Sequence, residues 1–104
     1  MHLDDQDILK LFSTKEKEQI AFGHLVRKYQ ERIYWHIRKM IINHEDANDV
    51  TQNTFIKIWK GLPNFKQDSN LFTWMYRIAT NETLNFIQKN KKRITQSIEN
   101  IQIE

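Results

Sequence analysis

The sequence predicts an all-α fold, a compact antiparallel bundle of about four helices. Glycine and proline are scarce, with two glycines and one proline in 104 residues, whereas folds of many short strands and turns need more of both. Apolar residues also recur at intervals of three and four along three long stretches, which is the period of an amphipathic helix. Since 39% of the residues are hydrophobic, the chain can bury one modest core, and we expect a single domain.

The N-terminal part of the chain is predicted to form two helices. The first covers residues 5–12, with Ile8, Leu11 and Phe12 on its apolar side. Residues 13–16, STKE, have the form of a capping box and are expected to open a long helix that reaches about residue 41. The long helix is predicted to be a core helix because it carries a continuous apolar stripe: Phe22, Leu25, Val26, Tyr29, Ile33, Ile37 and Met40.

A third helix is predicted to begin at Asp46 as its N-cap and to reach about residue 60, before Gly61 and Pro63 stop it. Its sequence separates two faces. The apolar face, expected in the core, contains Ala47, Val50, Thr54 and Ile58. The other face contains Asp49, Gln52, Asn53 and Ile56. An acid, two amides and an isolated isoleucine suit a contact with a basic helix of another protein, but an ordinary surface with one stray isoleucine fits equally well.

The main loop is predicted at residues 61–70, GLPNFKQDSN, which combine glycine, proline and several polar turn residues. Ser69 or Asn70 would cap a fourth helix that continues through Phe86 and into the basic residues 89–93. Its core side is expected to contain Leu71, Met75, Ile78, Ala79 and Phe86.

A second stripe on the fourth helix has the chemistry of a nucleic-acid contact. It consists of Trp74, Arg77, Asn81, Asn85, Gln88 and Lys92, at intervals of three or four. An aromatic ring can stack on bases, amides can pair with base edges, and cations can contact phosphates. In the loop, Phe65 and Lys66 place an aromatic ring beside a cation, as a pocket for an unstacked base would need. Both aromatic residues have an alternative role, because Trp74 can be a partly buried core residue and Phe65 can simply pack onto the bundle.

Charge supports a polyanionic partner. Residues 57–93 contain eight basic and two acidic residues, a local charge of +6, although the whole chain carries only +3. A basic half on a mildly charged protein is typical of nucleic-acid binding, and a solvated surface is the alternative.

Other classes of protein are disfavoured. Without cysteine, the chain has no disulfide and no thiolate metal site. An acidic N-terminus and the lack of a long apolar stretch predict a cytoplasmic protein without a membrane association. An enzyme is not expected, because the chain has no glycine-rich phosphate loop and because Asn48 replaces the second histidine of an H-E-x-x-H zinc motif at His44. We predict neither a cofactor nor a metal.

Two motifs resemble a known family. Residues 46–59 (DANDVTQNTFIKIW), followed after the loop by residues 72–81 (FTWMYRIATN), resemble the paired signature of region two in extracytoplasmic-function sigma factors of bacterial RNA polymerase. The resemblance covers about residues 21–93. It implies that the third helix binds the clamp helices of the polymerase largest subunit. It also implies that the loop and the fourth helix recognise the minus-ten promoter element as a melted non-template strand.

The candidate site residues follow from this resemblance together with the two stripes. The residues expected to bind polymerase are Asp46, Asp49, Gln52, Asn53 and Ile56. The residues expected to bind DNA are Asn64, Phe65, Lys66, Trp74, Arg77, Asn81, Asn85, Gln88, Lys89, Lys92 and Arg93.

The resemblance also predicts a domain organisation. Residues 1–93 would form the region-two domain and residues 94–104 the start of an interdomain linker, with the family's second domain, which binds the minus-35 element, absent. An anti-sigma factor is a possible further partner. A helical adaptor that binds protein but no nucleic acid remains the alternative function.

Overall fold

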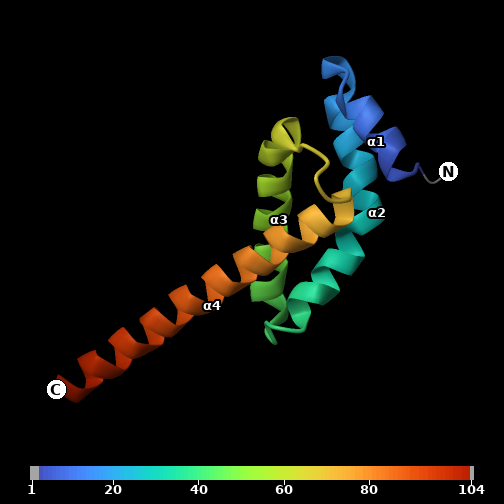
Figure 1. The fold of residues 1–104 in the computed structure, drawn as a ribbon. Helices are drawn as coiled ribbons and strands as arrows, with labels where there is room; N and C mark the ends of the chain where they lie inside the picture. Colours follow the sequence, from blue (N-terminus) through green and yellow to red (C-terminus); the bar gives the residue numbers. More distant parts are fainter. Residues whose placement is uncertain (1–2, 104) are drawn as a thin grey trace.

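The structure, a computed structural model, describes residues 3–103 and the side chains of residues 3–100. The elements are the helices α1 (Asp5–Phe12), α2 (Glu18–Arg38), α3 (His44–Gly61) and α4 (Leu71–Ile103), with short 3₁₀ turns η1 (Lys15–Lys17) and η2 (Leu62–Asn64). No strand occurs within residues 3–103, so the all-α prediction of about four helices is confirmed. Helix α2 packs against α1, α3 and α4, and α3 also packs against α4 (Figure 1).

Side-chain caps fix where the helices begin. Helix α1 begins after Asp4, whose carboxylate accepts a hydrogen bond from the Asp7 N–H at 2.8 Å. Helix α4 begins after Asn70, whose side-chain oxygen accepts from the Thr73 N–H at 2.8 Å, as the sequence predicts. An N-cap side chain of this kind satisfies a backbone donor that the helix itself leaves without a partner.

Two of the predicted caps are wrong. The capping box at residues 13–16 does not form, because the Ser13 hydroxyl donates to the Lys10 carbonyl at 2.6 Å at the end of α1. The chain then makes η1, and α2 begins only at Glu18. Helix α3 is capped by Asn43, whose side chain accepts from the Asp46 N–H at 2.9 Å, so Asp46 lies inside the first turn.

The core is formed where the apolar stripes of α2, α3 and α4 meet. Its main contributors are Ala21, Leu25, Tyr29, Ile33 and Ile37 from α2, Ala47, Val50 and Ile58 from α3, and Leu71, Met75 and Ala79 from α4. Three buried threonines, Thr51, Thr54 and Thr83, each donate to the carbonyl four residues earlier at 2.7 Å. Their hydroxyl groups are therefore buried without an unsatisfied donor.

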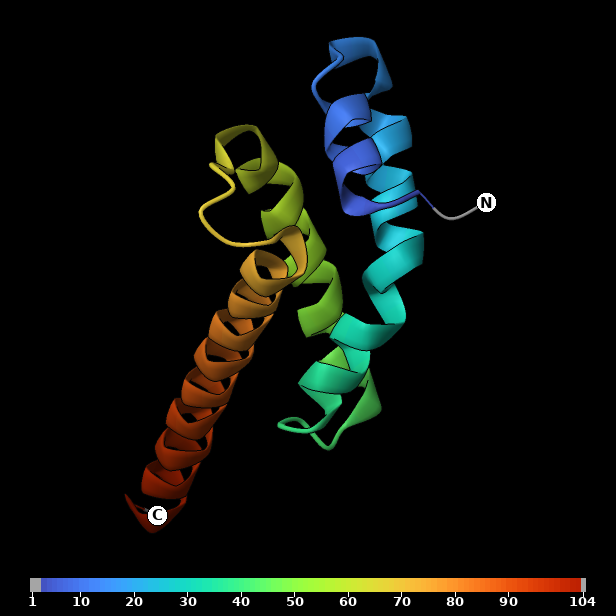
Figure 2. The ribbon, with the colours of Figure 1, turned by 45° about the vertical axis from the view of Figure 1, so that its right-hand side comes forward.

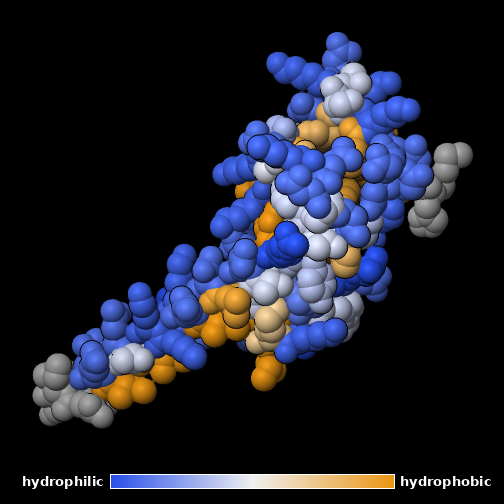
Figure 3. Space-filling model, in the orientation of Figure 1, coloured by the Kyte–Doolittle hydropathy of each residue, from blue (hydrophilic) through white to orange (hydrophobic). Residues whose placement is uncertain are grey.

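Helix α4 is longer than the bundle. Its 33 residues correspond to a length of about 50 Å, and the described chain measures 59 × 24 × 24 Å along its principal axes. Residues 88–100 are all exposed, and the C-terminal part of α4 projects away from the other helices (Figures 1 and 2). Hydrophobic residues lie along one side of this projecting part (Figure 3). Ile94 and Ile98 in this part of α4 are exposed.

Candidate nucleic-acid interface

The outer face of α3 is exposed from Asp49 to Ile56. Asp49, Gln52 and Asn53 are exposed, and Ile56 retains 51% of its accessible surface, whereas Ile58 on the opposite face is fully buried. Asp46 is only partly exposed at the start of the helix. The predicted division of α3 into two faces is confirmed, and Asp49, Gln52, Asn53 and Ile56 lie together on the outer face.

An apolar groove of about 460 Å³ adjoins this outer face, between α2 and α3. Gln52 and Ile56 line it from the outer face, and further lining comes from Phe22, Val26, Phe55 and Trp59. Edge-to-face contacts hold Trp59 in place, with ring centroids 5.1 Å from Phe22 and 5.9 Å from Phe12. The isolated isoleucine of the sequence is thus the edge of a larger apolar surface, which the pattern on α3 alone does not reveal.

The loop between α3 and α4 is packed against the start of α4. The rings of Phe65 and Trp74 lie 4.9 Å apart, and both side chains are partly buried against the core. The two aromatic residues therefore pack against each other and the bundle, and neither is a fully exposed stacking platform. Asn64 and Lys66, on either side of Phe65, are exposed. Gln67 has a φ of 60°, a left-handed conformation that is uncommon for a residue other than glycine.

The second stripe of α4 is exposed after its first member. Trp74 is partly buried, but the rest of the stripe is open to solvent: Arg77, Asn81, Asn85, Gln88 and Lys92. Lys89 and Arg93 are exposed on the same part of the helix. The structure therefore brings amides and cations together on one surface that begins at the loop and continues along α4.

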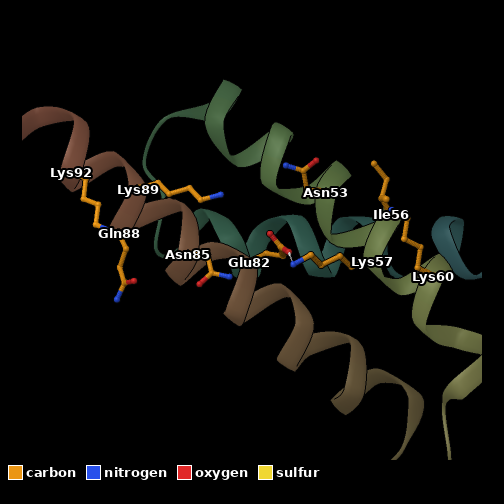
Figure 4. Close-up of a pocket in the computed structure, with 9 residues that line it drawn as sticks. All are labelled: Asn53, Ile56, Lys57, Lys60, Glu82, Asn85, Gln88, Lys89 and Lys92. Carbon is orange, nitrogen blue, oxygen red and sulfur yellow. Dashed lines mark ion pairs between the residues drawn. The ribbon is translucent and has the colours of Figure 1, made fainter.

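A groove of about 470 Å³ lies between α3 and α4 (Figure 4). Four lysines from the two helices line it: Lys57, Lys60, Lys89 and Lys92. Glu82, the acid near the apolar side of α4, forms an ion pair with Lys57 across the groove (Figure 4). The side chain of Glu82 is only 13% exposed, so the ion pair provides the partner that a nearly buried carboxylate needs.

Helix α2 is joined to α4 through a partly buried histidine. The ring of His36 stacks on Tyr76 with centroids 3.6 Å apart, and its Nε2 lies 2.8 Å from the Thr80 hydroxyl. Because that hydroxyl donates to the Tyr76 carbonyl at 3.0 Å, it accepts from Nε2–H, which leaves Nδ1 unprotonated and buried. Burial, and secondarily the charge of Lys39, lowers the pKa of His36 below its ordinary value of 6.5.

Helix α1 is anchored to α2 by a charged cluster away from these surfaces. The Asp5 carboxylate accepts from the Lys28 ammonium at 2.9 Å and from the Tyr29 hydroxyl at 2.6 Å. The hydrogen bond to Asp5 raises the pKa of Lys28, and burial raises the pKa of Tyr29.

Within the described residues, no group of three or more histidine or carboxylate side chains is placed to hold a metal ion. None of the described helices is long and apolar enough to cross a membrane.

Comparisons with known proteins agree with this arrangement. The Sigma-70 region 2 family model matches residues 25–93. The RNA polymerase sigma-H factor of Pseudomonas aeruginosa is 37% identical over 89 residues, which are 86% of this chain and 45% of that protein. The ECF RNA polymerase sigma factor SigW of Bacillus subtilis is 34% identical over 82 residues, which are 79% of this chain and 44% of that protein. The chain thus spans less than half the length of these relatives.

A solved structure is similar over nearly its whole length. The NMR structure of an engineered region 2 of sigmaE in complex with GTAAAA superimposes with a TM-score of 0.77 and 31% sequence identity. The match covers 88% of this chain and 93% of that one. The chain belongs to the Sigma-70 region 2 family, within the group of extracytoplasmic-function sigma factors.

Proposed function

We propose that this chain is a sigma-factor domain that binds the RNA polymerase core and holds the melted minus-ten promoter element as a single strand. The observation that carries the proposal is the similar region 2 of sigmaE, which was solved with GTAAAA, a sequence of DNA bases. The Sigma-70 region 2 match, residues 25–93, includes the loop and α4 up to Arg93, where this chain carries exposed amides and cations.

The proposed polymerase contact is the outer face of α3 with the adjoining apolar groove. Exposed Asp49, Gln52 and Asn53 can hydrogen-bond to a partner, and Ile56 and Trp59 offer apolar surface for it to cover. An apolar centre with a polar rim is the usual composition of a protein interface. The proposed partner is the pair of clamp helices of the largest polymerase subunit, and we propose a cytoplasmic location because polymerase acts there.

The proposed DNA contact begins at the loop and runs along α4. Exposed Asn64 and Lys66 would receive a base at the loop, while Arg77 would contact a phosphate and Asn81 a base edge. Phe65 and Trp74 support the loop from beneath, since each packs on the other. We propose residues 1–93 as the binding domain, of which residues 1 and 2 lie outside the described residues, and the projecting end of α4, from residue 94, as the start of a linker.

Fluorescence anisotropy with labelled GTAAAA and a scrambled strand of the same composition tests the DNA function. We expect the parent to prefer GTAAAA and Asn64→Ala to lose part of that preference, about 1–3 kcal/mol. Arg77→Gln should instead weaken the binding of both strands. It should also make the slope of log affinity against log salt concentration shallower by about 0.7. Lys10→Gln removes the same charge from α1 and is the control. Equal binding of the two strands by the parent would contradict recognition of the minus-ten element, and no binding of either strand would favour a helical adaptor that binds only protein.

A further inference from the structure

The DNA stripe of α4 leads into the groove between α3 and α4. Asn85, Gln88 and Lys92 belong to that stripe, and all three also line the groove. The opposite wall carries Lys57 and Lys60 of α3 (Figure 4). A strand that follows the stripe therefore reaches a channel with cations on two different helices.

The groove has a net positive charge, and the lysines that carry it are accessible to a ligand. Glu82 is the acidic residue of its lining, and the ion pair with Lys57 neutralises it. Lys60, Lys89 and Lys92 are exposed and have no carboxylate within 4.0 Å among the described side chains. Three lysines without an acidic partner attract an anion more strongly than they stabilise the fold.

The dimensions suit a nucleic-acid backbone. Between Asn85 and Lys92, the first and last stripe residues that line the groove, the helix axis advances about 10 Å, which is room for a short stretch of an extended strand. Two amides of α4, Asn85 and Gln88, line the groove beside the lysines, whereas Asn53 and Ile56, which also line it, belong to the proposed polymerase face of α3. Such a lining can contact phosphates along its length without demanding a particular base sequence.

We propose that the groove between α3 and α4 holds the phosphate backbone of the single strand where it continues beyond the GTAAAA element, and that Lys60 contacts this backbone from α3. The inference rests on the proposed DNA-binding function and extends it to a second helix. Lys57 acts through another residue: it keeps the charge of Glu82 from repelling the phosphates.

The test compares two labelled strands, GTAAAA alone and GTAAAA flanked on both sides by a short run of thymidines. Anisotropy at several salt concentrations gives the slope of log affinity against log salt for each strand. For the long strand, Lys60→Gln should make the slope shallower by about 0.7, so that a tenfold rise in salt weakens the variant about fivefold less than the parent. For GTAAAA alone, Lys60→Gln should behave as the parent does.

Two matched variants sharpen the comparison. Lys60→Arg keeps the charge and should keep the slope, whereas Lys15→Gln removes a charge from η1, which packs against α2, and should change nothing. Lys57→Gln exposes the strand to the charge of Glu82 and should weaken binding of the long strand. The double variant Lys57→Gln/Glu82→Gln removes both charges and should restore most of that loss.

The outcomes separate this inference from the proposed function. If the salt slope for the long strand is the same in Lys60→Gln and in the parent, the groove does not hold the phosphate backbone. This conclusion holds even when the parent prefers GTAAAA over its scrambled control. If the parent binds GTAAAA no better than the scrambled strand but Lys60→Gln still makes the salt slope of the long strand shallower, the promoter function is contradicted. The groove then remains a strand-binding site. Absence of binding to both strands by the parent overturns both.

Discussion

The ring of Phe65 in the loop lies 4.9 Å from the ring of Trp74 in the first turns of α4. The Trp74 ring also packs closely against Gly61 at the end of α3. A Cβ built on Gly61 would lie only 2.9 Å from Trp74 Cζ2. The end of α3, the loop and the start of α4 therefore form one packed unit. Exposed Asn64 and Lys66 are held on this unit, which limits the freedom of the loop before any strand binds.

Gly61→Ala should destabilise the domain. Its new methyl group would meet a rigid indole at 2.9 Å, and we expect the free energy of unfolding to fall by about 1–3 kcal/mol in urea titrations. Gly23→Ala is the matched control, because its new methyl group would meet only the flexible Arg27 side chain at 3.5 Å or more. In the middle of α2 it should stabilise the domain by about 0.5–1 kcal/mol. Equal effects of the two substitutions would show that Trp74 is not fixed against α3.

Met75 and Asn81 should differ sharply in their contribution to stability. Met75 is fully buried in the core, and Met75→Ala is expected to lower the free energy of unfolding by about 2–5 kcal/mol through the cavity it leaves. Asn81 lies on the exposed stripe of the same helix, and Asn81→Ala should change the free energy by no more than about 0.5 kcal/mol. Similar losses from both substitutions, measured by chemical denaturation, would mean that the faces of α4 are assigned incorrectly.

His36 should make stability fall as the solution becomes acidic. Burial lowers the pKa of its imidazole in the folded state below the ordinary 6.5, so the unfolded chain takes up the proton first. The contribution of neutral His36 to the free energy of unfolding is therefore complete above about pH 6.5 and is lost as pH falls below it. His36→Gln can still donate to Thr80 but cannot titrate. Urea titrations at a series of pH values should show a flatter dependence for this variant, and an unchanged dependence would contradict the assignment.

Ile56→Glu should weaken binding to the polymerase core without unfolding the domain. Ile56 is half exposed at the edge of the apolar groove, and a charge placed at an apolar contact is expected to cost about 1–3 kcal/mol of binding free energy. Ile42→Glu introduces the same change in the turn between α2 and α3, at a side chain that is 89% exposed. Binding titrations with core polymerase should show a loss for Ile56→Glu alone. Parallel losses for both variants would point to a general effect of charge.

The sequence predicts the helices and their faces well where one periodic stripe decides them. Val50 and Ile58 are buried and Gln52 and Asn53 are exposed, because each position on a helix follows from its spacing. The N-cap of α3 was harder to predict, since Asn43 and Asp46 are both good capping residues and only the local backbone selects between them. Spacing within a helix also gives no information on contacts between helices.

The parts of the site that the sequence does not predict are those made by two elements together. Phe65 and Trp74 lie nine positions apart, and no pattern reveals that the loop folds back onto the helix that follows it. Lys60 and Lys92 belong to separate helices, and only the packing of α3 against α4 brings them to one groove. The spacing along α4 places Glu82 near the apolar side of the helix without showing a partner for its charge. The partner, Lys57, comes from α3.

The central claim is that one domain links the polymerase to the melted minus-ten strand. The most direct test is whether core polymerase retains a labelled GTAAAA strand during size-exclusion chromatography with and without this chain. We predict that the strand is retained only when the chain is present, and that it is not retained with Ile56→Glu. That variant should still bind GTAAAA by itself, because the six-base strand does not reach the groove between α3 and α4 that Ile56 also lines. Retention that is the same without the chain, or unchanged with Ile56→Glu, would contradict the claim.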